Sequence, residues 1–65
     1  RFGGDSMKVG DLVKWPLGKD VFWLAIVMAD PIDDLGTPST LVQWVTGRYV
    51  GDTDYIYTED LEVIG

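Results

Sequence analysis

The longest apolar stretch of the chain runs from Phe22 to Ala29 and is followed, after one aspartate, by Pro31. Eight residues are far fewer than the roughly 20 that a membrane-spanning helix needs. The stretch is rich in aromatic and branched side chains, which favour strands, and proline cannot donate to a central ladder. We predict a strand over residues 22–30, the most buried of the fold. A buried helical segment is the alternative interpretation, but the run has no N-cap residue.

Branched, aromatic or alternating apolar residues indicate four more strands along the chain. We expect them at residues 9–15, 40–46, 54–58 and 62–64. Within residues 40–46, Val42 and Trp44 lie on the same face because side chains alternate along a strand, and we assign both to the core.

Gly, Pro, Asp, Ser and Thr mark the connections between these strands. We expect a first loop at residues 16–21, the longest loop at 31–40 (PIDDLGTPST) and an extended hairpin loop at 47–53 (GRYVGDT). Residues 58–61 (TEDL) indicate a single helical turn before the last strand, with the Thr58 hydroxyl as its cap.

The size of the chain and its lack of two residue types argue against an enzyme. With 65 residues there is room for one domain with a thin core. The chain contains no histidine and no cysteine, which removes the usual bases, nucleophiles, soft metal ligands and disulfides. Glu59, Asp60 and Glu62 are explained by capping and solvation, and there is no phosphate-binding glycine motif. We therefore expect no catalytic residue and no cofactor.

The charge of the chain points to a particular kind of partner. Asp and Glu number 11 against 5 Lys and Arg, for a formal net charge of −6. Lys8, Lys14, Lys19 and Arg48 are too few and too scattered for a phosphate-binding stripe, so we expect no nucleic acid and no membrane as partner. An acidic surface favours a protein with a basic surface. Mimicry of nucleic-acid charge is a further possibility if the carboxylates gather on one side.

The first six residues (RFGGDS) are polar and glycine-rich, and Met7 follows them as a natural start. We expect residues 1–6 to be a remnant of cloning and residues 7–65 to form the domain. The cytoplasm is our default for its location.

The expected order of strands and loops, with one helical turn before the fifth strand, resembles the SH3-like barrels. The segments VGDLV (9–13), AIV (25–27), VQW (42–44) and EDLEVI (59–64) resemble small uncharacterised phage and bacterial proteins of this fold. The ending is also similar to that of the SH3-like accessory subunit of photosystem I, although that family docks through basic side chains. The resemblance implies an all-β, five-stranded SH3-like barrel, and, for a phage protein, the cytoplasm of the host cell.

The aromatic side chains are too many for so small a core, so some must reach the surface. Ring faces attract cations, and nearby carboxylates add to that attraction; in Tudor and chromo-barrel relatives, such cages bind methylated lysine or arginine. The residues that we expect to form a binding face come from the hairpin and the first loop: Trp15, Trp23, Tyr49, Asp52, Asp54, Tyr55 and Tyr57. The alternative is that the rings simply cover the core by cross-strand pairing.

Two acidic pairs are candidate oxygen ligands for Ca²⁺ or Mg²⁺, namely Asp33 with Asp34 and Asp52 with Asp54. Neither has the dense alternation and glycine of a calcium loop, so we predict solvated carboxylates and no metal site. A proline-rich peptide groove would also use exposed tyrosine and tryptophan, but the chain lacks the ALYDY-like run of signalling SH3 domains.

The sequence thus predicts a non-catalytic module that binds a basic or cationic protein segment. The alternative is a structural or assembly protein that forms homo-oligomers, or docks on a larger particle, through exposed aromatic residues of the second strand.

Overall fold

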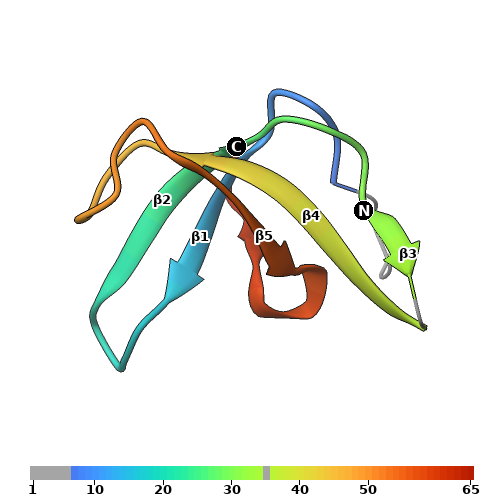
Figure 1. Cartoon of the computed structure of the whole chain (residues 1–65). Coiled ribbons are helices and arrows are strands. Elements are labelled where there is room, and N and C mark those ends of the chain that lie inside the picture. Colours follow the sequence, from blue (N-terminus) through green and yellow to red (C-terminus); the bar gives the residue numbers. More distant parts are fainter. Residues whose placement is uncertain (1–6, 35) are drawn as a thin grey trace.

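The computed structural model describes residues 7–34 and 36–65, without the side chain of Asp34. Our expectation for residues 1–6 lies outside the described residues. The fold is all-β, as predicted, with a single 3₁₀ turn, η1 (Figure 1). Its elements are β1 (Leu12–Pro16), β2 (Phe22–Val27), β3 (Ile32–Asp34), β4 (Thr37–Trp44), β5 (Thr53–Tyr57), η1 (Thr58–Asp60) and β6 (Glu62–Val63).

All strand pairs are antiparallel and belong to one curled sheet in the form of a half-barrel. The main path runs β3, β4, β2, β1, β6, and β5 pairs with β4 outside this path, so the first strand lies beside the last. Strand β4 is long enough to pair with β2 and β3 along one side and with β5 along the other. This curled antiparallel sheet, with η1 directly before the last strand, is consistent with the small all-β barrel that the sequence predicts (Figure 1).

The prediction of a long loop at residues 31–40 is wrong. The segment forms a hairpin in which β3 pairs with the first part of β4, so the sheet has six strands and not five. The φ angle of Gly36 is 83°, which suits a tight turn. The β-branched Thr37 and Thr40 favour extending the strand toward that turn. Pro38 lies opposite Asp33 in this outer part of the sheet.

The ends of the first two strands also differ from the prediction. Strand β1 begins at Leu12 because a turn precedes it, in which the backbone N–H of Asp11 donates to the Lys8 carbonyl and Gly10 has a φ of 96°. Strand β2 ends at Val27, three residues before the predicted end.

The described part of the chain contains no helix long and apolar enough to cross a membrane.

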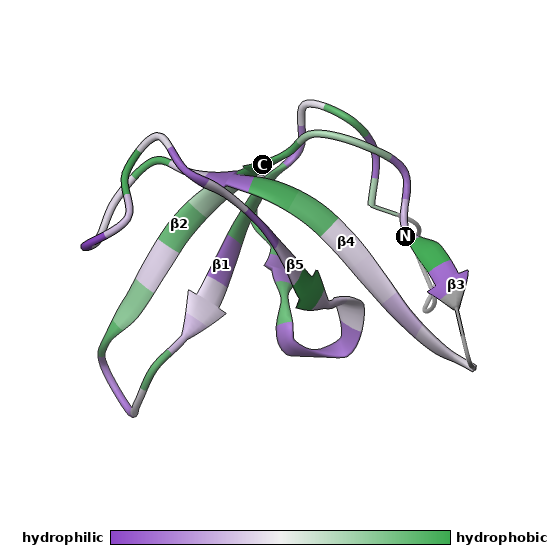
Figure 2. Ribbon diagram, in the orientation of Figure 1, coloured by the Kyte–Doolittle hydropathy of each residue, from purple (hydrophilic) through white to green (hydrophobic). Residues whose placement is uncertain are grey.

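The core lies on the concave face of the curled sheet. Val42 and Trp44 are buried, as predicted, with exposed fractions of 0% and 2%. The other buried apolar side chains are Met7, Val13, Ala25, Val27 and Leu61. Strand β4 supplies one more buried residue than β2, so the expectation that the second strand is the most buried is wrong. Figure 2 shows hydrophobic residues where β4 passes β2 and paler ones near β3.

The helical turn η1 is present, but Thr58 does not cap it as predicted. No side-chain hydrogen bond caps the turn. The Thr58 hydroxyl instead lies 2.7 Å from the hydroxyl of Thr40, a fully buried residue of β4. The Thr40 Oγ1 also lies 3.8 Å from the Met7 Sδ. Thr58 therefore connects the turn to the core, because burial of the Thr40 hydroxyl requires a hydrogen-bond partner.

Candidate binding site

Three tryptophans from three neighbouring strands lie together on the concave face. Trp15 and Trp23 are cross-strand partners, and Ala25 pairs with Trp44. Each tryptophan lies two residues from a buried residue of its own strand, or is itself buried, and alternation therefore places all three on the core side. The ring centroids of the three pairs are 5.4, 5.6 and 5.8 Å apart.

The loop between β4 and β5 adds a fourth ring, that of Tyr49. Its centroid lies 5.7 Å from that of Trp23, and the two ring planes meet at 77°. The four residues Trp15, Trp23, Trp44 and Tyr49 are called the aromatic cluster below. Pairs at these distances and angles favour each other beyond the area that they bury.

Two glycines fold this loop back over the concave face. Gly51 has a φ of 92°, its N–H donates to the Trp44 carbonyl, and the Trp44 N–H donates to the Asp52 carbonyl. Gly51 and Asp52 thus lie opposite the single residue Trp44, which is a β-bulge whose glycine is in the left-handed region. Gly47 has a φ of 94°, and a Cβ built there would lie 2.5 Å from an atom of the Trp23 ring. The backbone of Gly47 is therefore pressed against that ring.

The rings of the cluster differ in exposure. Trp44 is buried, Trp15 and Trp23 are partly buried, and 48% of Tyr49 is exposed. Because the two rings of each of these four pairs are already in contact, no ammonium group fits between them. The alternative interpretation, that the rings only cover the core, is sufficient for Trp44, because its ring is buried. The remaining ring surface of Trp15, Trp23 and Tyr49 faces solvent and can contact a cation from outside.

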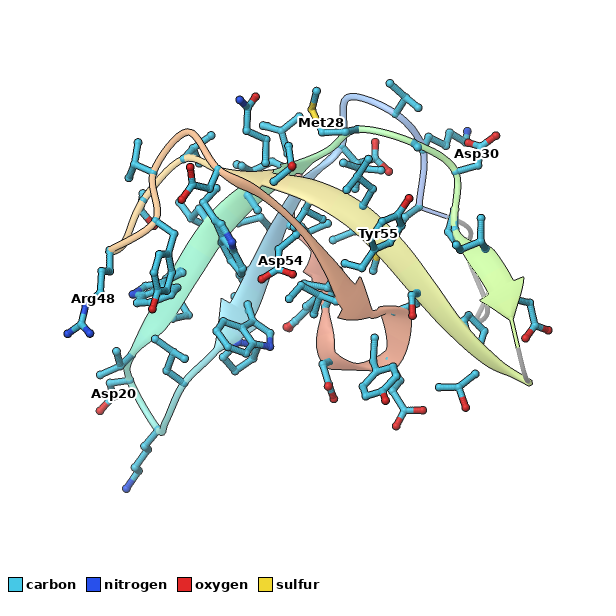
Figure 3. All side chains as sticks on the ribbon, in the orientation of Figure 1. Asp20, Met28, Asp30, Arg48, Asp54 and Tyr55 are labelled. Atoms are coloured by element: carbon cyan, nitrogen blue, oxygen red, sulfur yellow. The ribbon has the colours of Figure 1, made fainter. Side chains whose placement is uncertain are left out.

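Two aspartates lie near Trp44 in the register of the sheet. Asp54 pairs with the buried Val42 and so belongs to the concave side of β5. In Figure 3, Asp54 and its neighbour Tyr55 lie on opposite sides of the β5 ribbon. Asp52 lies in the bulge opposite Trp44, and both carboxylate residues are exposed. The concave face therefore carries negative charge beside partly exposed rings.

Tyr55 and Tyr57 are not part of this arrangement. Tyr55 pairs with Leu41 and Tyr57 with Ser39, whereas Ile56 between them pairs with the buried Thr40. Both tyrosines consequently face the outer side of the sheet, with exposed fractions of 58% and 57%. Of the seven predicted residues, Tyr55 and Tyr57 thus lie on the outer side of the sheet, apart from the tryptophans and Asp54 on the concave side.

Two residues of the arrangement were absent from the predicted face. Trp44 was assigned to the core, which is correct, but its ring also supports Trp15 and Trp23. Gly47 was predicted only as a loop residue, since a glycine beside a strand signals a turn and not a contact with a distant ring.

Among the side chains that the structure describes, no three acidic residues come close enough together to hold a metal ion. The side chain of Asp34, one of the candidate ligands, lies outside this description.

Comparisons of the chain with protein-family models, curated proteins and solved structures found no match.

Proposed function

We propose that the domain is a non-catalytic interaction module that binds a basic segment of another protein on its concave face. The observation that carries this proposal is the set of partly exposed rings of Trp15, Trp23 and Tyr49 beside the Asp52 and Asp54 carboxylates. A lysine or arginine placed over such a ring gains about 0.5–1 kcal/mol at an exposed site. If the chain is phage-encoded, as the resemblance suggests, the partner is a host protein of the cytoplasm.

The distribution of charge supports a basic partner at this side of the molecule. Residues 49–65 include five acidic residues and neither lysine nor arginine, and Arg48 is the one basic residue of the adjoining β4–β5 loop. Of the basic residues elsewhere, Lys14 lies 3.7 Å from Glu62 and 5.0 Å from the centre of the Phe22 ring. Lys14 and Phe22 alternate with the buried positions of β1 and β2, so they belong to the outer side.

A peptide titration tests the proposal directly. A lysine-rich heptapeptide added to the domain is expected to shift the amide and indole NMR signals of Trp15, Trp23, Tyr49 and Asp54. Because the attraction is electrostatic, salt at 0.5 M is expected to weaken the binding severalfold. If no basic peptide shifts these signals at millimolar concentration, the proposal is wrong.

Matched variants separate a local site from a general effect of charge. Asp54→Asn and Asp30→Asn remove the same charge, but Figure 3 places Asp30 at the other end of the molecule, after β2. We expect Asp54→Asn to weaken peptide binding about fivefold and Asp30→Asn less than twofold. Tyr49→Ala is expected to weaken it by a similar factor, whereas Tyr49→Phe retains the ring and the binding.

The outer face favours a second candidate function, assembly with itself or with a larger particle. Several of its apolar side chains are well exposed, among them Phe22 at 45% and Val45 at 42%. Apolar area of this kind on a small domain is typical of a contact surface. Light scattering tests this function, because a strict monomer at millimolar protein concentration excludes self-assembly.

A further inference from the structure

The hydrogen-bonding directions of β4 show which backbone groups of β5 point away from the sheet. The Leu41 carbonyl accepts from the N–H of Met28, next to β2, whereas the Trp44 N–H donates to the Asp52 carbonyl on the β5 side. Alternate residues of a strand bond to opposite sides. Thr40 and Val42 therefore bond to Ile56 and Asp54, their partners in register.

It follows that the N–H and C=O groups of Thr53, Tyr55 and Tyr57 point to the open side of β5. Within the described residues, β5 pairs with β4 and with no other strand. These three backbone units are called the β5 edge below. A row of unpaired donors and acceptors of this kind is a template for an added strand.

The β5 edge is the longest free edge among the outer strands of the sheet. Strand β5 has five residues, whereas β3 has three and β6 has two. Proteins usually guard a long edge with lysine, proline or an inward-pointing charge. Strand β5 has neither lysine nor proline, but its Asp54 points to the concave side. An inward carboxylate opposes the addition of an apolar strand and accepts one that brings a cation.

The charges around this edge specify the occupant. Asp52 directly precedes β5, and Asp54 belongs to it. Glu59 and Asp60 follow the strand in η1. A second copy of the chain could present its own β5, β3 or β6. Pairing through β5 would bring the Asp52 and Asp54 carboxylates of both copies to one shared edge, and β3, with Asp33, or β6, with Glu62, would likewise bring acidic residues to it. An extended basic segment of another protein meets no such repulsion.

We propose that the basic partner binds in an extended conformation and adds a strand to the β5 edge. This inference rests on the proposed function, and it specifies how the partner is held. Backbone hydrogen bonds from Thr53, Tyr55 and Tyr57 give the affinity, and alternate side chains give the selectivity. Side chains on one face of the added strand reach Asp54 and the aromatic cluster, and those on the other face reach Tyr55 and Tyr57.

This mode of binding accounts for the division of the predicted site between two faces of the sheet. Neighbouring residues of a strand point to opposite faces, and an added strand does the same. Asp54 and Tyr55 can therefore contact the same partner segment although they lie on opposite sides of β5.

The experiment uses a soluble heptapeptide with alternating lysine and threonine and two N-methylated forms of it. One form carries a methyl group on the backbone nitrogen of every lysine, and the other carries it on the backbone nitrogen of every threonine. A bound strand turns only one of these two sets of N–H groups toward β5. We expect one methylated form to lose at least tenfold in affinity and the other less than threefold. Amide hydrogen exchange of Thr53, Tyr55 and Tyr57 is expected to slow at least tenfold when the unmodified peptide binds.

Two variants test the same edge from the side of the protein. Tyr55→Pro removes the N–H that points away from β4, so the β4–β5 ladder keeps its bonds. Tyr55→Thr removes the ring and keeps the N–H. We expect Tyr55→Pro to bind the peptide at least threefold more weakly than Tyr55→Thr, provided that both give a dispersed amide spectrum.

The possible outcomes distinguish this inference from the proposed function. If the unmodified peptide binds but both methylated forms bind equally well, with no slowing of exchange at the β5 edge, the added strand is wrong and the proposed function stands. If no lysine-containing peptide binds, the proposed function is wrong as well. If exchange at the edge slows with protein concentration alone, the occupant is a second copy and the inference is overturned.

Discussion

The two ends of the concave face are closed in different ways. At the aliphatic end, Val13, Val27 and Val42 have no exposed surface, and Met7 and Leu61 pack beside them. At the aromatic end, Trp15 and Trp23 cover Trp44 and remain partly exposed themselves. The first end consists of small branched side chains, and the second of large rings held by the β4–β5 loop.

This difference follows from the size of the chain. A barrel of 65 residues has too little interior to enclose three tryptophans and a tyrosine. The aliphatic end can be closed completely because valine side chains fit between neighbouring strands. The aromatic end stabilises the fold and in addition presents ring surface to solvent. Binding and stability therefore use the same residues at one end only.

The largest effect is expected when the support of the aromatic end is removed. Trp44→Ala deletes a ring that is only 2% exposed, so it should lower the free energy of unfolding by about 3–5 kcal/mol. A chain of this length has a total stability of only about 3–10 kcal/mol. Urea unfolding followed by far-UV circular dichroism is expected to show a large fall in the midpoint, or no folded baseline.

Trp15→Ala is the matched change at a ring of the same cluster that is partly exposed. Trp15→Ala should lower the free energy of unfolding clearly less than Trp44→Ala, because less buried apolar area is lost. Equal losses for the two variants would contradict the distinction between a supporting ring and the rings that cover it.

The second effect concerns the contact that holds the loop on the aromatic end. Gly47→Ala combines a φ of 94° with a Cβ that would lie 2.5 Å from a Trp23 ring atom. Backbone strain and overpacking together should lower stability by about 2–3 kcal/mol. A blue or red shift of tryptophan fluorescence is expected in the same variant, because the Trp23 ring has to move.

Two other glycines separate the causes of this loss. Gly51→Ala shares the positive φ, 92°, but its Cβ meets no atom within 4 Å, so only strain of about 1 kcal/mol is expected. Gly18→Ala has neither feature and should change stability by less than about 0.5 kcal/mol. If all three variants unfold at the same urea concentration, the contact between Gly47 and Trp23 does not hold the loop.

The aliphatic end was largely predictable from the sequence, and the arrangement of the aromatic end was not. Alternation along residues 40–46 placed Val42 in the core because a strand has only two faces. Alternation also identified the strand at 54–58, and the aromatic and branched residues of the apolar run identified the strand at 22–30, with errors of a few residues at the ends. The 31–40 segment was misjudged because its Pro, Gly and Asp residues outweighed the strand propensity of its threonines.

The grouping of the rings depends on contacts between distant parts of the chain. Tyr55 was expected beside Tyr49 because both belong to one hairpin, but the register of β5 directs it to the other face. A shift of one residue in that register would exchange the faces of Asp54 and Tyr55. Register is fixed here by the bulge at Gly51 and Asp52, and no single residue type in the sequence announces a bulge.

The smallest effect tests the contact between the Thr40 and Thr58 hydroxyls at the aliphatic end. Thr40→Val leaves the partly buried Thr58 hydroxyl without the partner that lies 2.7 Å away, and Thr58→Val leaves the buried Thr40 hydroxyl with only the Met7 sulfur, a weak acceptor, at 3.8 Å. Each single change should cost about 1–2 kcal/mol, because an unsatisfied buried hydroxyl loses its hydration without compensation. The double variant removes both hydroxyls and should therefore cost about 1 kcal/mol less than the sum of the single changes.

Urea unfolding of the four proteins in this double-mutant cycle measures the coupling. Strict additivity would show that water replaces the lost partner, and hence that the aliphatic end is open to solvent near η1. A coupling of about 1 kcal/mol would instead show that this end is closed even where it contains polar groups. The contrast with the aromatic end would then be one of access to solvent, and not merely of apolar against aromatic side chains.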